Sequence, residues 1–297
     1  MSPQKQKRLM DVGGAIGVGI LAGWRSFETT REIKKRLKQT DVTIQLLKPL
    51  TQDIWPCENK RKLILIAQDD QAKILEPLAE QHNIELLVRP NFIAISDMRQ
   101  WCWEYFQKHF HWYVSSDSHL RSFKKHPIYN LEPQLDVLYA EAFSSHIIGN
   151  IFQMVTNFPH VYVGGWGTRN CGLEFPLING HQTTNPREYP FYVRNLVVAR
   201  TDGSGFYPEG WNVLEDAHFI LSTLAAGGGV VKFRDAELRS GATHSQAGLA
   251  RHPEYNQRLI ELTEIFGKKI VKRLIKDSTR GDQKRETSLY QSVLVGI

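Results

Sequence analysis

The sequence predicts an α/β fold with a single mixed sheet flanked by helices, and three observations support this. Lys62–Ala67 is a continuous apolar run of strand length, as expected for a strand that is covered on both faces. Segments with helical periodicity alternate with such runs between Lys62 and Val114, which is the pattern of βαβ units. Polar residues follow the runs directly, so the carboxyl ends of the strands are expected to form a polar edge where ligands bind.

The composition is that of an ordinary globular protein, with 41% hydrophobic and 23% charged residues. A chain of 297 residues can bury one large core or two smaller ones. The formal net charge of +6 allows a polyanionic partner. The three cysteines, Cys57, Cys102 and Cys171, are far apart and odd in number. They indicate neither a disulfide framework nor a zinc site, so we expect a reducing, cytoplasmic compartment.

An apolar, glycine-rich stretch, Val12–Ala22, follows the basic residues of the N-terminus. A charged start and a short apolar run are typical of a signal peptide, and Gly17–Ala22 also mimics a dinucleotide-binding fingerprint. However, Asp11 interrupts the first pattern, and neither a clear strand nor an immediate helix flanks the second. We therefore favour a first strand with a close-packed turn. The stretch is too short to span a membrane, and we expect no membrane span.

Elements of alternating type are expected before the centre of the chain. Helices are predicted at Ser26–Lys38, Ala72–His82 and Ile95–Phe110, and strands at Val42–Leu47, Lys62–Ala67 and Ile84–Val88. Asp69 and Asp70 end the strand at Lys62–Ala67, where either can cap the helix that follows. Ser96 or Asp97 is expected near the cap of the third helix.

The central stretch is Trp112–Phe123, in which a buried strand ends at Val114 and the chain turns polar. Asp117 and His119 lie two residues apart in the predicted turn, so both side chains can face one ion. One carboxylate and one imidazole suit Mn²⁺ better than Mg²⁺, which prefers oxygen ligands. Taken alone, Asp117-Ser118-His119 is explained more simply as a solvated turn. The motifs before and after it in the sequence therefore decide between a turn and a metal site.

The second half of the chain continues with strands and glycine-bearing turns. Helices are predicted at Leu131–His146 and Pro253–Lys276, and strands at Val161–Val163, Tyr192–Ala199 and Val230–Phe233. A glycine-bearing loop, Gly164–Gly167, follows the first of these strands and allows close approach of a ligand. Asn212 or a neighbour is expected to cap a helix with Glu215 and Asp216 in its first turn. The helix dipole favours acidic groups there, which is an alternative to any catalytic role.

The segment Asp117-Ser118-His119 resembles the metal motif of GT-A glycosyltransferases, in the Asp-x-His form of the polypeptide N-acetylgalactosaminyltransferases. The resemblance implies a GT-A-type, Rossmann-like sheet whose metal motif holds Mn²⁺, or Mg²⁺, against the diphosphate of a nucleotide sugar. It implies that Ser116 and Asp117 contact this donor. Arg99 stands where GT-A enzymes often carry an arginine close to the donor, and a solvated helix arginine is the alternative.

Two further features follow in the same order as in GT-A enzymes. Gly164, Gly165 and Trp166 match a glycine-bearing loop that faces the donor sugar, with a tight hairpin turn as the alternative. Glu215 and Asp216 match an acidic pair at a helix start. This implies that Asp216 faces the acceptor hydroxyl and, in inverting members, removes its proton.

Other positions complete the site that the resemblance implies. Trp211, just before the acidic pair, matches a platform on the acceptor side. His244, in a late polar loop, matches a third ligand of the metal or diphosphate, although a lone loop histidine often has no role. Asp69 or Asp70 could contact the uracil or ribose of the donor, and helix capping explains them equally well.

Among GT-A proteins, the chain is most similar to the TET-associated glycosyltransferases. Those carry an Arg-Gln pair before the metal strand, a polar metal motif followed by Phe, and a Trp before Glu-Asp. The matching segments here are Arg99-Gln100, Ser116–Phe123 and Trp211–Asp216. The similarity implies transfer of a sugar, from a UDP-sugar, to a hydroxymethylated base of double-stranded DNA. Such enzymes often come from phages and would act in the host cytoplasm. Ser115 departs from the pattern, since many GT-A motifs have a first Asp there.

One continuous domain with four parts is expected. These are an N-terminal segment at 1–61 that packs on or enters the sheet, a nucleotide-sugar-binding half at 62–126, an acceptor half at 127–252, and an amphipathic helix with a polar tail at 253–297. Other functions stay open. The same fold could glycosylate a surface glycan or a protein, and the missing first Asp could mark an inert nucleotide- or DNA-binding relative. A nucleotidyltransferase would need more clustered Asp residues than Ser115-Ser116 allows.

Overall fold

The computed structural model describes residues 15–23, 29–51, 61–125, 147–151, 154–155, 160–166, 181–182, 196–233, 236–240, 253–268 and 271. Within these ranges the strands are β1 (Ile16–Leu21), β2 (Arg61–Gln68), β3 (Glu85–Arg89), β4 (Trp112–Asp117), β5 (Leu120–Lys125), β6 (Val161–Trp166), β7 (His181–Gln182), β8 (Leu196–Arg200), β9 (Gly229–Phe233) and β10 (Ala236–Ser240). The bounded helices are α2 (Thr30–Leu47), α3 (Ala72–His82), α4 (Ile95–His109), α6 (Glu215–Ala225) and α7 (Tyr255–Phe266), with short 3₁₀ turns at Lys48–Thr51 and Asp69–Gln71. Residues 147–151 and 154–155 are also helical.

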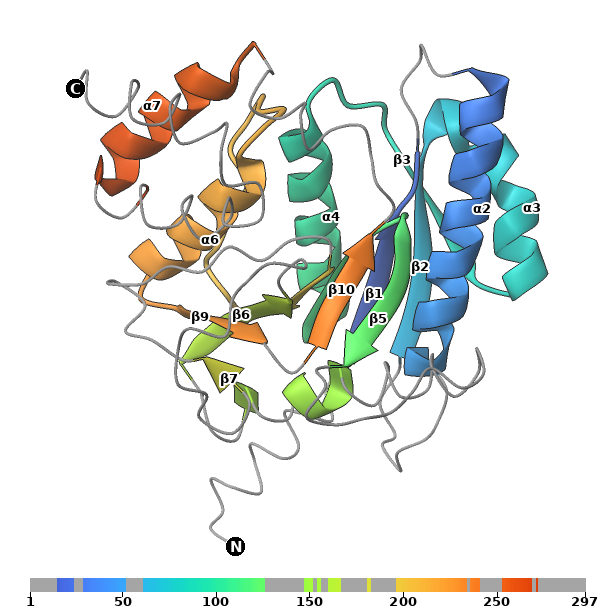
Figure 1. The fold of residues 1–297 in the computed structure, drawn as a ribbon, viewed down its shortest axis with the longest axis horizontal. Helices are drawn as coiled ribbons and strands as arrows, with labels where there is room; N and C mark the ends of the chain where they lie inside the picture. Colours follow the sequence, from blue (N-terminus) through green and yellow to red (C-terminus); the bar gives the residue numbers. More distant parts are fainter. Residues whose placement is uncertain are drawn as a thin grey trace, which may run out of the picture.

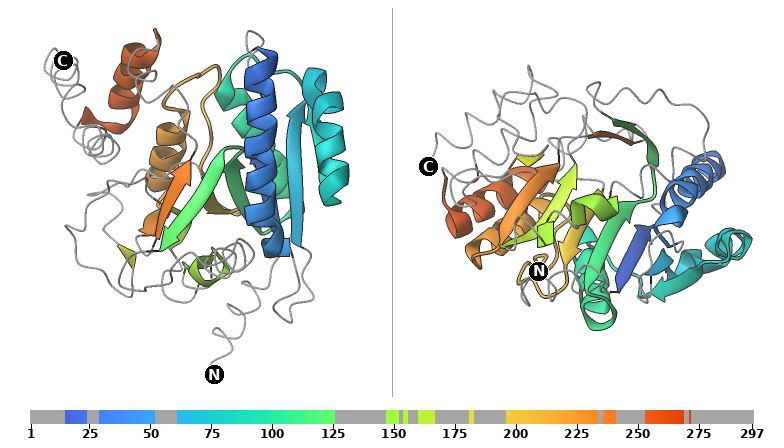
Figure 2. Two further views of the ribbon diagram at one scale, coloured as in Figure 1. Left: turned by 45° about the vertical axis from the view of Figure 1, so that its right-hand side comes forward. Right: turned by 90° about the horizontal axis from the view of Figure 1, so that it is seen from below.

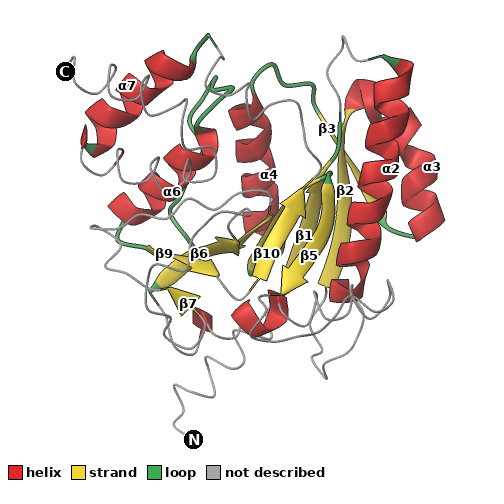
Figure 3. Ribbon diagram, viewed as in Figure 1, coloured by secondary structure: helices red, strands yellow, loops and turns green. Residues whose placement is uncertain are grey.

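A mixed sheet forms the centre of the molecule (Figures 1 and 3). Within the described residues it has eight strands in the order β3-β2-β1-β4-β8-β6-β9-β7. Strands β3, β2, β1 and β4 run parallel, β8 runs antiparallel to β4 and β6, and β9 is parallel to β6. Strands β5 and β10 form a separate antiparallel pair. The predicted α/β class, with one mixed sheet flanked by helices, is therefore confirmed.

Helices cover both faces of this sheet (Figure 2). Side chains alternate along β2, so that Leu63 and Leu65 join a core with α2 and α3, whereas Ile64 and Ile66 join a core with α4, α6 and α7. All four side chains are at most 4% exposed. A strand buried on both faces needs apolar residues at every position, which explains the continuous run in the sequence.

Strand β1 lies between β2 and β4 and confirms the first strand favoured from the sequence. Its glycines are needed because α4 packs directly on it. A Cβ atom on Gly17 would lie 2.5 Å from ring carbons of Phe106, and one on Gly19 would lie 2.9 Å from the same ring. Both contacts are shorter than real Cβ atoms tolerate. The glycine spacing therefore reflects helix packing, and the dinucleotide-binding interpretation is wrong.

The predicted strand at Val42–Leu47 is wrong, because these residues form the second half of α2. The β-branched residues at 42–44 favour a strand locally. In the helix, however, Ile44 and Leu47 are fully buried in the core beneath α2. Thr40 and Thr43 are satisfied as well, since their hydroxyls donate to carbonyls four residues earlier at 2.9 and 3.0 Å. Burial of one helix face outweighs the local preference for a strand.

Other predicted elements differ in their limits. The amphipathic helix predicted at Pro253–Lys276 is interrupted, since α7 ends at Phe266, Gly267 follows with a φ of 90°, and Lys268 and Val271 are again helical. The β5–β10 pair was not predicted, and the helix predicted at 131–146 lies outside the described residues. In the described part of the chain, no helix has the length and apolar character needed to cross a membrane. The division into four parts stays a prediction.

Candidate active site at the carboxyl edge of the sheet

Asp117 is the last residue of β4 and lies at the carboxyl edge of the parallel half of the sheet. Its side chain is 23% exposed, and its backbone is in register with Leu21 at the end of β1. Ser115 and Ser116 belong to the strand and not to the predicted polar turn. Ser116 is 1% exposed, and its hydroxyl donates to the carbonyl of Asp117 at 2.9 Å. In this structure Ser116 is an internal residue, and the predicted donor contact is not available to it.

Arg99 connects the two acidic motifs of the sequence. It comes from the second turn of α4, and its side chain is 18% exposed. Its Nη2 atom lies 3.5 Å from Oδ1 of Asp117, and its Nε atom lies 3.3 Å from Oε1 of Glu215. Burial acts to lower the pKa of this guanidinium, but Glu215 and then Asp117 raise it well above its ordinary value. Arg99 is therefore not a solvated helix arginine.

Glu215 and Asp216 begin α6, as predicted, but they occupy different surroundings. Glu215 is 7% exposed and faces Arg99, whereas Asp216 is only partly buried. Burial raises the pKa of Glu215 to about 7, Asp216 adds to the increase, and Arg99 opposes it. One residue of the pair is thus part of an internal ion pair, and the other lies closer to the surface.

The start of α6 is set by its loop and not by a side-chain cap. Leu214 is the N-cap residue, with a φ of 61°, and no side chain caps the helix. The prediction that Asn212 caps α6 is wrong, because Oδ1 of Asn212 accepts from the backbone N–H of Ile95 at 3.3 Å, at the start of α4. The loop before α6 is thereby joined to α4.

Polar side chains from the first turns of α4 hold this loop, residues 206–212. Gln100 accepts from the backbone N–H of Tyr207, Asp97 accepts from Gly210, and Ser96 accepts from Trp211, each at 2.8 Å. Ser96 and Asp97 therefore bind the loop and do not cap α4, whose N-cap is Ala94. These contacts with the loop were not predicted from the sequence. The sequence feature that could have revealed these contacts is the group of polar side chains at the start of a helix that is otherwise rich in aromatic residues.

Trp211 is a core residue in this structure. It is 5% exposed, packs edge-on against His218 with ring centroids 5.4 Å apart, and lies beneath the guanidinium of Arg258 at 5.1 Å. A ring buried in this way has no free face on which a sugar could stack. The predicted acceptor platform is therefore wrong for Trp211.

Gly164, Gly165 and Trp166 lie in strand β6, so the predicted loop at this position is wrong. Gly164 and Gly165 are buried and pair with β8 and β9. Val197 of β8 is in register with Ser115 on one side and Gly165 on the other. The end of β6 thus lies at the same edge as Asp117, two strands away.

Asp69 and Asp70 follow the end of β2 and are exposed at the same edge. The N-cap residues of the 3₁₀ turn and of α3 are Gln68 and Gln71, and neither helix start has a side-chain cap bond. Helix capping, the alternative explanation for the two aspartates, is therefore not observed.

His119 is partly buried in the turn between β4 and β5, two residues after Asp117. His244, the predicted third ligand, lies outside the described residues. Within the described part of the chain, no group of three or more His, Cys, Asp or Glu residues could hold a metal ion. Asp117 and His119 can supply two ligands of the kinds that Mn²⁺ accepts, so further ligands would have to come from elsewhere in the chain or from the substrate.

The chain is similar to known proteins in its three-dimensional structure but not in its sequence. No protein-family model and no curated protein matches the sequence. A mycobacterial protein of solved structure has a TM-score of 0.51 at 13% identity, over 90% of this chain and 79% of that one. The mannosyltransferase PcManGT from Pyrobaculum calidifontis, solved with GDP-Man and Mn²⁺, has a TM-score of 0.50 at 11% identity, over 84% of this chain and 64% of that one.

A structure of TarS from S. aureus with UDP has a TM-score of 0.43 at 12% identity, over 92% of this chain and 73% of that one. At these identities the likenesses establish fold alone. The chain has a mixed α/β fold of the GT-A glycosyltransferase type.

Proposed function

We propose that this chain is a metal-dependent glycosyltransferase that moves a sugar from a nucleotide sugar to a hydroxyl acceptor. One observation carries the proposal. Arg99 joins Asp117, at the carboxyl end of a central parallel strand, to Glu215 in the first turn of α6. Two acidic motifs about 100 residues apart in the sequence therefore meet at the edge where α/β sheets bind ligands.

The donor side of the proposed site is built around Asp117 and His119. These residues, with His244 from outside the described residues, would bind Mn²⁺ or Mg²⁺. When bound, the ion would stabilise the negative charge that develops on the diphosphate leaving group. Arg99 orients the Asp117 carboxylate, and the exposed Asp69 or Asp70 would contact the base or ribose of a UDP-sugar.

On the acceptor side, we assign the role of general base to Asp216. It lies next to Glu215 but is less buried, and consecutive helix residues point about 100° apart. Glu215 is already directed at Arg99, so it is better suited to positioning than to proton transfer. Asp216 would remove the proton of the acceptor hydroxyl as the sugar is transferred.

The acceptor that we propose is a hydroxymethylated base of double-stranded DNA, and the transferred group is a hexose or pentose. Support comes from the resemblance of Arg99-Gln100 and Trp211–Asp216 to the TET-associated enzymes, and from the net charge of +6. Such an enzyme, from a phage, would work in the host cytoplasm. A glycosyltransferase for glycans or proteins would share the donor site but not this acceptor.

A panel of nucleotide sugars with Mn²⁺ tests the proposal, read first by thermal shift and then by release of free nucleotide. One donor should raise the melting temperature and be hydrolysed slowly without an acceptor. Asp117→Ala should abolish the Mn²⁺-dependent shift while the fold persists, because this strand-end side chain is not part of a core. The control is Asp202→Ala, in an exposed turn at the opposite edge of the sheet.

Two outcomes would contradict the proposal. If no donor binds with any divalent ion, the chain is an inert relative. If Asp117→Ala binds the donor with the metal dependence of the wild type, the metal assignment is wrong.

A further inference from the structure

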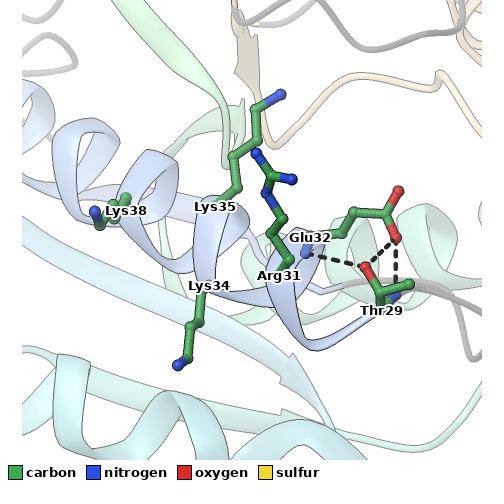
Figure 4. A pocket seen from close by; sticks show the side chains of 6 residues that line it. All are labelled: Thr29, Arg31, Glu32, Lys34, Lys35 and Lys38. Atoms are coloured by element: carbon green, nitrogen blue, oxygen red, sulfur yellow. Dashed lines mark hydrogen bonds between the residues drawn. The ribbon is translucent and has the colours of Figure 1, made fainter.

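The first half of α2 carries an exposed cationic face. Arg31, Lys34, Lys35 and Lys38 are all exposed and follow an i, i+3, i+4, i+7 pattern, which places them on one side of the helix. Together with Thr29 and Glu32 they line a pocket on the surface of this helix. Figure 4 shows Lys34 and Lys35 directed to opposite sides of this face, with Arg31 between them. We call these four side chains the cationic face of α2.

The nearby acidic groups of α2 are engaged elsewhere. Both the backbone N–H and the hydroxyl of Thr29 donate to the carboxylate of Glu32 at 2.8 Å, which forms a capping box. Asp41 lies 2.5 Å from Nε2 of His82 on α3. Among the described residues, no ion pair is formed by any of the four cations. Like charges three and four residues apart repel one another and destabilise the helix. An anion bound to the cationic face would reduce this repulsion.

The cationic face lacks the features of a membrane-binding helix. The apolar side chains between its cations are Ile33 and Leu37, which are half-buried, and Leu37 packs against the core. An interfacial helix would instead present large apolar side chains to the outside. The chemistry of this face is therefore that of a site for phosphate groups.

The position of α2 connects this face to the candidate active site. Strand β1 ends at Leu21, in register with Asp117, and α2 begins at Thr30 after a short connection. The cationic half is thus the end of α2 nearest the carboxyl edge of the sheet (Figure 1). A long polymer that reaches the acceptor side of the proposed site could extend along this helix.

We propose that the cationic face of α2 binds the phosphodiester backbone of double-stranded DNA and holds the acceptor at the site. This inference rests on the acceptor class assigned under the proposed function. The face extends about 10 Å along the helix axis, from Arg31 to Lys38. Duplex DNA carries one charge per about 1.7 Å, so several phosphates lie within reach of four cations.

The test measures binding of the full chain to a fluorescein-labelled DNA duplex of about 30 base pairs across a salt series. The variant Lys35→Gln/Lys38→Gln removes two positive charges from the face. Each phosphate contact contributes a slope of about one to the plot of log affinity against log salt, so the variant should lower the slope by about two. Lys108→Glu is the matched control, because it causes the same net change at an exposed position near the end of α4. It should leave the slope unchanged.

Donor hydrolysis separates this inference from the proposed function. The double variant should release nucleotide from the donor sugar at the wild-type rate. If the wild type hydrolyses the donor but the double variant and Lys108→Glu have equal salt slopes, the inference is overturned and the glycosyltransferase proposal stands. If duplex binding depends on Lys35 and Lys38 but no donor is hydrolysed, the proposed function fails and the DNA-binding face stands. Binding to phosphatidylserine vesicles, with none to the duplex, would also overturn the inference.

Discussion

Glu215 and Asp216 are neighbours at the start of α6, yet their side chains lie in different surroundings. Glu215 is directed at Arg99, and Asp216 is nearer the surface. Asp216→Asn keeps the shape of the side chain and removes its charge and basicity. If Asp216 is the general base, this variant should lower sugar transfer about a hundredfold or more, as measured by product formation under saturating donor. Donor binding should be unchanged.

Glu215→Gln is the comparison for this prediction and should have the milder effect on transfer. Near wild-type transfer by Asp216→Asn would rule out its role as base. Loss of donor binding in the same variant would instead place the acidic pair in the donor site.

Glu215 also makes stability depend on pH. Burial raises its pKa from the ordinary 4.5 to about 7, so between these values the folded state holds a proton that the unfolded state releases. The contribution of Glu215 to stability is therefore complete below about pH 4.5 and is lost as the pH rises through 7. Glu215→Gln cannot ionise. Its free energy of unfolding, relative to wild type, should rise across this range by at most about 1.4 kcal/mol per pH unit.

Urea unfolding of both proteins at several pH values measures this difference. Glu264→Gln, at an exposed position of α7, is the control and should show no such trend. A difference between Glu215→Gln and wild type that stays constant with pH would contradict the prediction.

At the scale of elements, helix α4 packs on β1 through glycine. Because a Cβ atom on Gly17 would meet the Phe106 ring at 2.5 Å, Gly17→Ala must displace α4 or the ring. Overpacking of this kind costs about 1–3 kcal/mol, which thermal or urea unfolding would detect. Gly149→Ala is the matched control, since a Cβ atom on this helical glycine has no neighbour within 4 Å. It should be neutral or slightly stabilising, and equal effects of the two changes would contradict the packing argument.

The first turns of α4 also position the start of α6. Gln100→Ala removes the acceptor for the backbone N–H of Tyr207 and frees one end of the loop before Glu215. We expect transfer to fall about tenfold, mainly in kcat, because the acidic pair loses its alignment while the donor ligands stay in place. Gln100→Glu keeps an acceptor oxygen but sets a second carboxylate beside Glu104, to which the Gln100 amide donates at 2.9 Å, so it should restore only part of the rate.

Gln107 provides the control for this prediction on the same helix. Its amide donates to the carbonyls of Thr201 and Gly203, away from the site. Gln107→Ala should leave kcat unchanged. An equal loss of kcat in both variants, or a loss confined to KM in Gln100→Ala, would argue against positioning by Gln100.

The elements that the sequence predicted well are those with a single strong signal. Lys62–Ala67 has apolar residues at every position, and the run became β2 with one residue more at each end. Val42–Leu47 failed because its β-branched residues favour a strand locally, whereas burial of Ile44 and Leu47 in the core decides for a helix. Gly164 and Gly165 failed for a related reason, since glycine can mark either a loop or a close-packed strand.

At the scale of the whole molecule, the order of elements was predictable but the contacts across it were not. The sequence predicted Glu215 at a helix start, which is confirmed, and Asp117 in a turn just after a strand, whereas Asp117 is the last residue of β4 at the same edge. That Arg99 joins them depends on how α4 and α6 lie on one face of the sheet. The burial of Trp211 could not be predicted either. A tryptophan before an acidic pair looks the same in the sequence whether its ring is exposed to a ligand or packed in the core.

The central place of β1 has a consequence for the growing polypeptide. Both of its partners follow it in the chain, and β4 is made about 100 residues later. At about 5–20 residues per second, a ribosome takes on the order of 5–20 s to supply that second partner. Both hydrogen-bonding edges of the strand are open until β2 is made about 45 residues later, and the edge that pairs with β4 stays open until β4 follows, which favours self-association. Gly17 and Gly19 weaken its intrinsic tendency to form a strand, so the residues that admit Phe106 in the finished protein also protect the nascent one.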